Sequence, residues 1–169
     1  MEYYSYLIIR ESVKELPLTL DIIDRQILRE LQRDGSLSIS ALADKLDMTA
    51  PPCWRRVQRL RDEGILDRRI WLVDPEKLGR GTIIYVTVKL ANHDRAATTA
   101  FRAAIQKLDE VLECYILLGG IDALIKIRVP NVKDYERIFY DRLSQLPAVR
   151  EFESSVVLSE VKQTTEIPV

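Results

Sequence analysis

The sequence predicts an α+β protein in two parts, and three observations support this. Up to residue 66, apolar residues recur at helical spacing; from residue 82 on, β-branched segments alternate with helical ones. Between these parts, Gly79 and Gly81 interrupt any regular element. We therefore divide the chain into an N-terminal extension (1–17), a helical domain (18–66), a linker with a short strand (67–81) and a βα domain (82–169).

The composition excludes some classes of protein. Lys and Arg number 25 against 26 Asp and Glu, so the chain is not a polycation that coats nucleic acid unspecifically. A local DNA-reading surface stays open, because six arginines lie between Arg55 and Arg69. Cys53 and Cys114 fall in apolar periodic segments, which predicts reduced, buried thiols in a cytoplasmic protein, and their spacing fits no metal site. The longest apolar runs are strand-length, so no membrane span is expected.

The extension (1–17) lacks the basic start and long apolar middle of a signal peptide. Three interpretations stay open for it: a flexible arm, a strand added to a partner, or a start-site extension.

The first clear helix follows Leu20. Asp21 is its expected cap, and Asp24 lies near the positive end of the helix dipole. The pair Asp34-Gly35 ends it. The expected buried stripe is Ile23, Ile27, Leu28 and Leu31.

Two further helices follow almost back to back, separated by Asp47-Met48. Ser38 and Thr49 are hydroxyl residues that can cap them, and Pro51-Pro52 suits a first helical turn. The second helix has an inward face at i, i+4, i+7 spacing and ends at a glycine: Cys53, Val57, Leu60 and Gly64. A short helix, a tight turn and a helix with Arg and Gln outward predict a helix-turn-helix (winged-helix-like) domain, completed by the first helix.

The second part has the order β-α-β-β-α-β, which predicts a ferredoxin-like unit with both helices on one sheet face. After a strand at 68–73 and a turn at Asp74-Pro75, we expect strands at 82–90, 111–118, 121–129 and 149–161 and helices at 94–108 and 132–146. Gly119-Gly120 is the expected two-residue turn with positive φ. Tyr85, Ile116 and the β-branched residues of the last strand make the other face apolar, so we expect at least a dimer.

With both parts placed, the sequence resembles the Lrp/AsnC family of bacterial regulators. The matching segments are LDIIDRQILRELQRDG (20–35), LSISALADKLDMTAPPCWRRVQRLRDEGIL (37–66), VDPEKLG (73–79), LECYILLGGIDALIKIRVPN (112–131) and LPAVREFESSVVLSEVK (146–162). The resemblance implies a DNA-binding N-terminal domain and a βαββαβ domain that oligomerises and senses amino acids. Dimers of the family commonly assemble further, so an octamer or similar assembly is expected.

The outward face of the second helix of the pair is the predicted DNA-reading surface. Arg55 and Gln58 are the expected base readers, because Arg reads guanine and Gln adenine in the major groove. Contacts with phosphate, sugar or thymine methyl groups are expected from residues around them, namely Ser38, Ser40, Thr49, Ala50, Pro51, Trp54 and Arg59. The alternative is ordinary solvated charge on a surface helix.

Other arginines and the one histidine carry weaker predictions. Arg56 and Arg61 lie nearer the core edge, where they can pair with acids of the first helix. Arg68 and Arg69 either reach phosphates or only flank the 68–73 strand. His93 lies in a polar loop and is expected to be solvated.

The turn Gly119-Gly120-Ile121-Asp122 is the candidate effector site. Consecutive backbone N–H groups can accept a carboxylate, and Asp122 can take the ammonium group of an amino acid. The alternative is a plain hairpin. The family turn usually has the pattern Gly-Asp-x-Asp, so Gly120 departs from it and removes one potential effector contact or changes which ligand is accepted.

The leading hypothesis is therefore a transcription regulator that binds double-stranded DNA and responds to an amino acid, with no catalytic residue, metal or other cofactor. Two alternatives use the same architecture. One is an enzyme similar to siroheme decarboxylases, which needs acid–base groups that His93 alone supplies poorly. The other is a stand-alone amino-acid-binding module, which leaves the arginine-rich helix unexplained.

Overall fold

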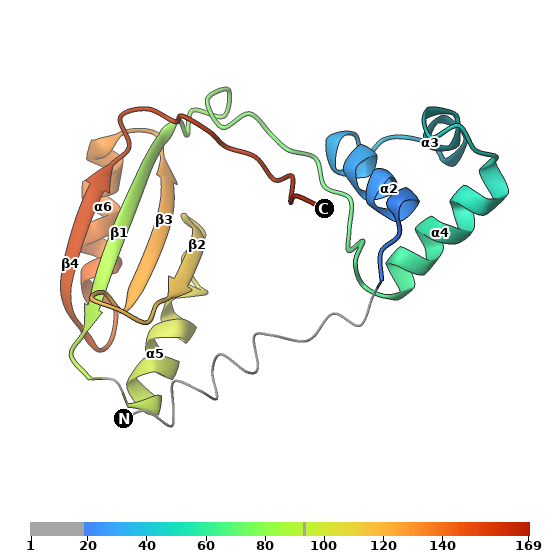
Figure 1. The fold of residues 1–169 in the computed structure, drawn as a ribbon. Helices are drawn as coiled ribbons and strands as arrows, with labels where there is room; N and C mark the ends of the chain where they lie inside the picture. The colour runs from blue at the N-terminus through green and yellow to red at the C-terminus, as the bar shows by residue number, and fades with distance from the viewer. Residues whose placement is uncertain (1–18, 93) are drawn as a thin grey trace. The chain divides into compact units, whose positions relative to one another are not determined.

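The computed structural model describes residues 19–92 and 94–169, and they form two compact units (Figure 1). The helical unit comprises the described residues up to Trp71 together with Thr164–Val169, and the sheet unit is Leu72–Gln163. In this division the last six residues group with the helical unit, while the sequence-based domain bounds stay a prediction. The interpretations of residues 1–17 and of His93 lie outside the described residues.

The helical unit contains α2 (Ile22–Arg33), α3 (Ile39–Lys45) and α4 (Ala50–Asp62). Asp21 caps α2 through a capping box with Asp24, and the Ser38 hydroxyl caps α3 by accepting a hydrogen bond from the Ala41 N–H. Thr49 occupies the N-cap position of α4, but its side chain makes no capping bond. One apolar core holds the three helices together: Ile27, Leu28, Leu42, Ala43, Cys53, Val57 and Leu60 are all buried.

The ends of α3 and α4 are each defined by a residue with a left-handed backbone conformation. Asp47 has φ 51°, and the N–H of Met48 donates to the Ala43 carbonyl oxygen at 3.0 Å, which ends α3 in a Schellman motif. Gly64, with φ 72°, ends α4 in the same way through the bond from the Ile65 N–H to the Leu60 carbonyl, at 2.9 Å. These two left-handed residues fix where the pair of helices turns and stops.

The sheet unit has one antiparallel sheet in the order β2-β3-β1-β4. Its elements are β1 (Thr82–Leu90), α5 (Arg95–Ile105), β2 (Val111–Ile116), β3 (Ala123–Val129), α6 (Val132–Asp141), the 3-10 turn η1 (Leu143–Gln145) and β4 (Val149–Val156). The predicted βαββαβ order is confirmed. Phe101 of α5 and Tyr135 of α6 pack on alternate residues of β1 and β3, so both helices cover one face of the sheet (Figure 1).

Three local predictions are wrong. Residues 68–73 form no strand within the described chain, because no segment there pairs with them. Strand β4 ends at Val156, short of 161. The β2–β3 connection is a six-residue loop closed by the Leu117 N–H donating to the Asp122 carbonyl at 2.9 Å, and Gly119 and Gly120 do not have positive φ.

The sheet face opposite the helices is more polar than predicted. Ile116 pairs with the buried Ala123, so strand alternation places it in the helix-side row, as it does Val156. Tyr85 does lie on the open face, beside ion pairs. These pairs are Lys126–Glu113, Lys89–Glu151 and Arg128–Glu160.

Among the described residues, no helix combines the length and apolar character that a membrane span requires.

Candidate functional site

The predicted DNA-reading surface lies on α4, whose opposite face is anchored in the core. Cys53, Val57 and Leu60 are at most 1% exposed, so they fix the rotation of the helix about its axis. That rotation leaves Arg55 exposed and Trp54 51% exposed on the other side. A cation and an aromatic ring on one helix face can contact phosphates and base edges in a groove wide enough for a helix.

The structure brings most of the predicted contact residues to the surface, with two exceptions. Exposed residues are Ser38, Ser40, Thr49, Pro51, Trp54, Arg55 and Arg59. Gln58 is half-buried, although the sequence pattern placed it directly outward. Ala50 packs against the core of the helical unit.

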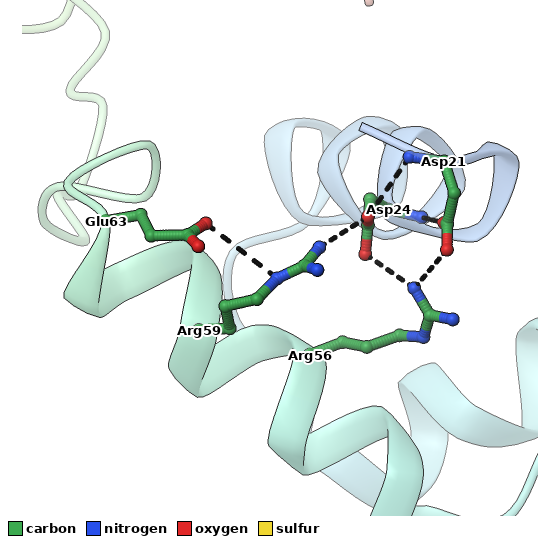
Figure 2. A network of polar contacts seen from close by, with 5 residues as sticks. All are labelled: Asp21, Asp24, Arg56, Arg59 and Glu63. Atoms are coloured by element: carbon green, nitrogen blue, oxygen red, sulfur yellow. Dashed lines mark hydrogen bonds and ion pairs between the residues drawn. The ribbon is translucent and has the colours of Figure 1, made fainter. Parts of the chain in front are cut away.

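A network of ion pairs joins α4 to the start of α2 (Figure 2). Arg56 Nη1 contacts Asp21 Oδ2 at 2.6 Å and Asp24 Oδ1 at 2.8 Å. Arg59 Nη2 donates to the other oxygen of Asp24, while its Nε lies 3.8 Å from Glu63 Oε2. Both oxygens of Asp24 are therefore paired with arginines one turn apart on α4.

Asp24 is the one charged residue that is fully buried in the described chain, with 0% exposure. Burying a carboxylate is costly unless it is paired, so Asp24 holds the two arginines in place. At the rim, the backbone N–H of Asp24 and the guanidinium of Arg56 lower the pKa of Asp21 from its usual 3.8. The two aspartates in turn raise the pKa of Arg56.

The network tests the predictions made for Arg56 and Arg61. The pairing of Arg56 with acids of the first helix is confirmed, whereas Arg61 is exposed and does not lie at the core edge. The role of Asp24 was not predicted from the sequence, in which it was expected only as an acid near the positive end of the helix dipole. A signal was present, since Asp24, Ile27, Leu28 and Leu31 follow i, i+3, i+4, i+7 spacing, which places the carboxylate on the apolar stripe.

The candidate effector turn is anchored to β1 at one end. The Asp122 N–H donates to the Val88 carbonyl at 2.9 Å, and its carboxylate accepts the Leu90 N–H at 2.8 Å. Gly119 and Gly120 are exposed, and a side chain at either position meets nothing within 4 Å. The Asp122 carboxylate therefore has a structural partner besides any ligand, while the glycines face open space.

The thiol of Cys53 lies in the helical core, where burial raises its pKa. Cys114 is half-buried, and burial raises its pKa as well. Both are free thiols; Cys53 is buried as predicted, whereas Cys114 is less buried than predicted.

A helix-turn-helix unit followed by a βαββαβ unit defines a class of two-domain DNA-binding proteins. The family described as "Winged helix-turn-helix DNA-binding" matches residues 20–67, and the "Lrp/AsnC ligand binding domain" family matches residues 83–167. The chain therefore belongs to the Lrp/AsnC family of transcription regulators.

Relatives and solved structures agree with this assignment. The chain is 35% identical over 150 residues to the DNA-binding transcriptional activator DecR of Escherichia coli K12, covering 89% of this chain and 99% of DecR. It is 35% identical over 157 residues to the leucine-responsive regulatory protein of Salmonella typhimurium, covering 93% of this chain and 96% of that protein. A transcriptional regulator from Neisseria meningitidis, solved as its complex with L-Met, has 32% identity and a TM-score of 0.84. The match covers 89% of this chain and 97% of the Neisseria chain.

Proposed function

We propose that the exposed face of α4 enters the major groove of double-stranded DNA, with Arg55 and Gln58 reading bases. The observation that carries this proposal is the rotation of α4: its buried face is fixed by the core, so Arg55 and Trp54 are presented together to solvent. Ser38, Ser40, Thr49 and Pro51 border this face and contact the sugar–phosphate backbone. Arg59 acts as a phosphate contact, since its side chain stays 43% exposed while Asp24 and Glu63 hold its guanidinium in place.

The test compares Arg55→Ala with Arg102→Ala, which removes an exposed arginine from the sheet unit. A preferred duplex is first selected from random sequences, and affinities are measured by fluorescence anisotropy. We expect Arg55→Ala to weaken binding to the preferred duplex by about 1–3 kcal/mol and to relax one base position, because a bidentate contact to a base is lost.

Arg102→Ala should bind as the unaltered chain does. If Arg55→Ala loses the same binding affinity on preferred and on random DNA, Arg55 is a phosphate contact. If the variant loses no affinity on either duplex, α4 is not part of the DNA interface.

We propose that the sheet unit binds an amino acid at residues 119–122, with Asp122 receiving the ammonium group. The exposed glycines and the carboxylate at the end of the loop support this, as does the L-Met complex of the Neisseria regulator. A thermal-shift screen of the twenty amino acids tests it, since a ligand that binds the folded state raises the melting temperature. Asp122→Asn keeps an oxygen for the Leu90 N–H but loses the charge, so it should lose the shift; a retained shift removes Asp122 from the site.

We propose further that the chain works as a homodimer or larger assembly in the cytoplasm, and is not an enzyme. Ile70, Trp71, Leu72 and Val73 form an exposed apolar run, with Trp71 92% exposed. Such a run, with β-branched residues and no partner strand in the described chain, fits pairing with a second copy. The relatives are named as transcription regulators, which favours this function over the decarboxylase alternative.

A further inference from the structure

Residues 164–169 are far from α2 in sequence and have no regular secondary structure, and they contact the flank of that helix. Gln32 pairs with the backbone of Ile167 on both sides: its Oε1 accepts the Ile167 N–H at 2.7 Å, and its Nε2 donates to the Ile167 carbonyl at 3.0 Å. A side-chain amide offers one donor group and one acceptor, as a peptide group does, so Gln32 substitutes for a neighbouring strand.

Further contacts extend this pairing along the helix. Arg29 Nη2 donates to the Val169 carbonyl oxygen at 2.6 Å, and Arg33 Nε lies 3.5 Å from Glu166 Oε1. Val169 is half-buried and packs against the core of the helical unit. Pro168 favours an extended conformation for Ile167, which reduces the entropy lost on docking.

The residues between β4 and this segment, 157–163, are anchored in the sheet unit. Directly after β4, the Val157 N–H donates to the Ile83 carbonyl at 2.9 Å. Glu160 Oε2 lies 3.4 Å from Arg128 Nη2, whose side chain is only 11% exposed. Residues 157–169 therefore have one set of contacts in each unit.

We propose that the flank of α2 formed by Arg29, Gln32 and Arg33 is a docking site for an extended peptide, and that its occupant is residues 164–169 of the same chain. Docking makes this segment a second connection between the two units, besides the linker at 67–81. Because α2 also holds Arg56 and Arg59 through Asp21 and Asp24, the docked segment and α4 both contact the same rigid helix. A change in the sheet unit then acts on α4; this last step rests on the proposed function.

Docking is tested on the full chain without DNA or effector, by hydrogen exchange at the Ile167 amide. Gln32→Ala removes both bonds to Ile167, and Gln26→Ala is the control, since Gln26 is exposed on the same helix. We expect the Ile167 amide to exchange about tenfold faster in Gln32→Ala, because two hydrogen bonds are lost, and unchanged in Gln26→Ala. An unprotected amide in the unaltered chain, or equal protection in all three proteins, overturns the proposal.

The occupant is tested with the cysteine substitutions Gln32→Cys and Ile167→Cys. With both in one chain, oxidation should join residues 32 and 167 within that chain, as mass spectrometry of the linked peptides shows. A link formed between singly substituted chains that are mixed means that a second copy supplies the segment, and overturns the intramolecular assignment.

The coupling is tested by the ratio of DNA dissociation constants with and without an equimolar mixture of the twenty proteinogenic L-amino acids. We expect the mixture to change the DNA dissociation constant by a factor at least three times smaller in Gln32→Ala than in Gln26→Ala. An identical ratio in both variants overturns the coupling. If the unaltered chain shows no response to the mixture, the proposed function fails, whereas docking is still decided by exchange at Ile167.

Discussion

Asp24 lies on the apolar stripe of α2, where its carboxylate is removed from water and receives two guanidinium groups (Figure 2). A buried charge of this kind adds little net stability compared with an apolar residue, but it specifies geometry, because only one packing of α4 on α2 pairs both oxygens. The direction of the Arg56 and Arg59 side chains is therefore fixed by a carboxylate of another helix. Arg55, on the side of α4 away from the buried Cys53, is left to solvent.

Replacing Asp24 by Asn should destabilise the helical unit by about 2–3 kcal/mol. The change leaves two arginines facing a neutral amide, while Asp21 and Glu63 still offset part of the loss. Denaturant unfolding followed by far-UV circular dichroism measures the effect. Glu63→Gln is the matched control: it removes only the exposed 3.8 Å pair with Arg59, so a change below about 0.5 kcal/mol is expected. Equal effects of the two substitutions contradict the role given to Asp24.

At the scale of the element, α4 is defined by its ends as much as by its faces. Its start tolerates Pro51 and Pro52 because first-turn N–H groups have no intrahelical partner. Its end requires the left-handed backbone of Gly64, which lets the chain turn so that Ile65 and Leu66 pack on the core. The helix therefore has a fixed length of 13 residues.

Gly64→Ala should lower the free energy of unfolding by about 1 kcal/mol, since an alanine is strained at φ 72°. A Cβ at this position meets nothing within 4 Å, so the loss reports backbone conformation alone. Thermal unfolding measures it. Gly35→Ala provides the comparison, because Gly35 does not have positive φ and its Cβ has an ordinary 3.7 Å contact with the Leu31 carbonyl. If both substitutions cost the same, the left-handed conformation of Gly64 is not what ends α4.

At the scale of the whole molecule, two units fold around separate cores, and the chain passes between them after Trp71 and after Gln163. The exposed run Ile70–Val73 spans the first of these two points. Large exposed apolar runs are uncommon in monomers, so this run supports the proposed self-association.

Sedimentation velocity should give the unaltered chain at least twice the mass of one copy. Trp71→Glu should shift the population towards single chains, because it places a charge in an apolar contact. Tyr140→Glu is the control, since Tyr140 is 64% exposed on α6, outside the run. A single-chain mass for the unaltered protein, or equal shifts in both variants, contradicts the proposed interface.

Features that depend on local patterns could be predicted from the amino-acid order alone. Apolar spacing defined the three helices of the DNA-binding unit and the face that Cys53, Val57 and Leu60 bury, and the alternation of strands and helices defined the βαββαβ order. Caps such as Asp21 and Ser38 were predictable, because a capping bond spans only three residues.

Which distant groups meet became visible only once the elements were packed together. The pairing of Asp24 with Arg59, the ion pairs on the open face of the sheet and the docking of Ile167 on Gln32 all join residues whose separation along the chain carries no local signal. Periodicity shows which face of an element is apolar. The partner of a polar group is fixed only when two elements pack and a charge or a peptide group, removed from water, must be paired.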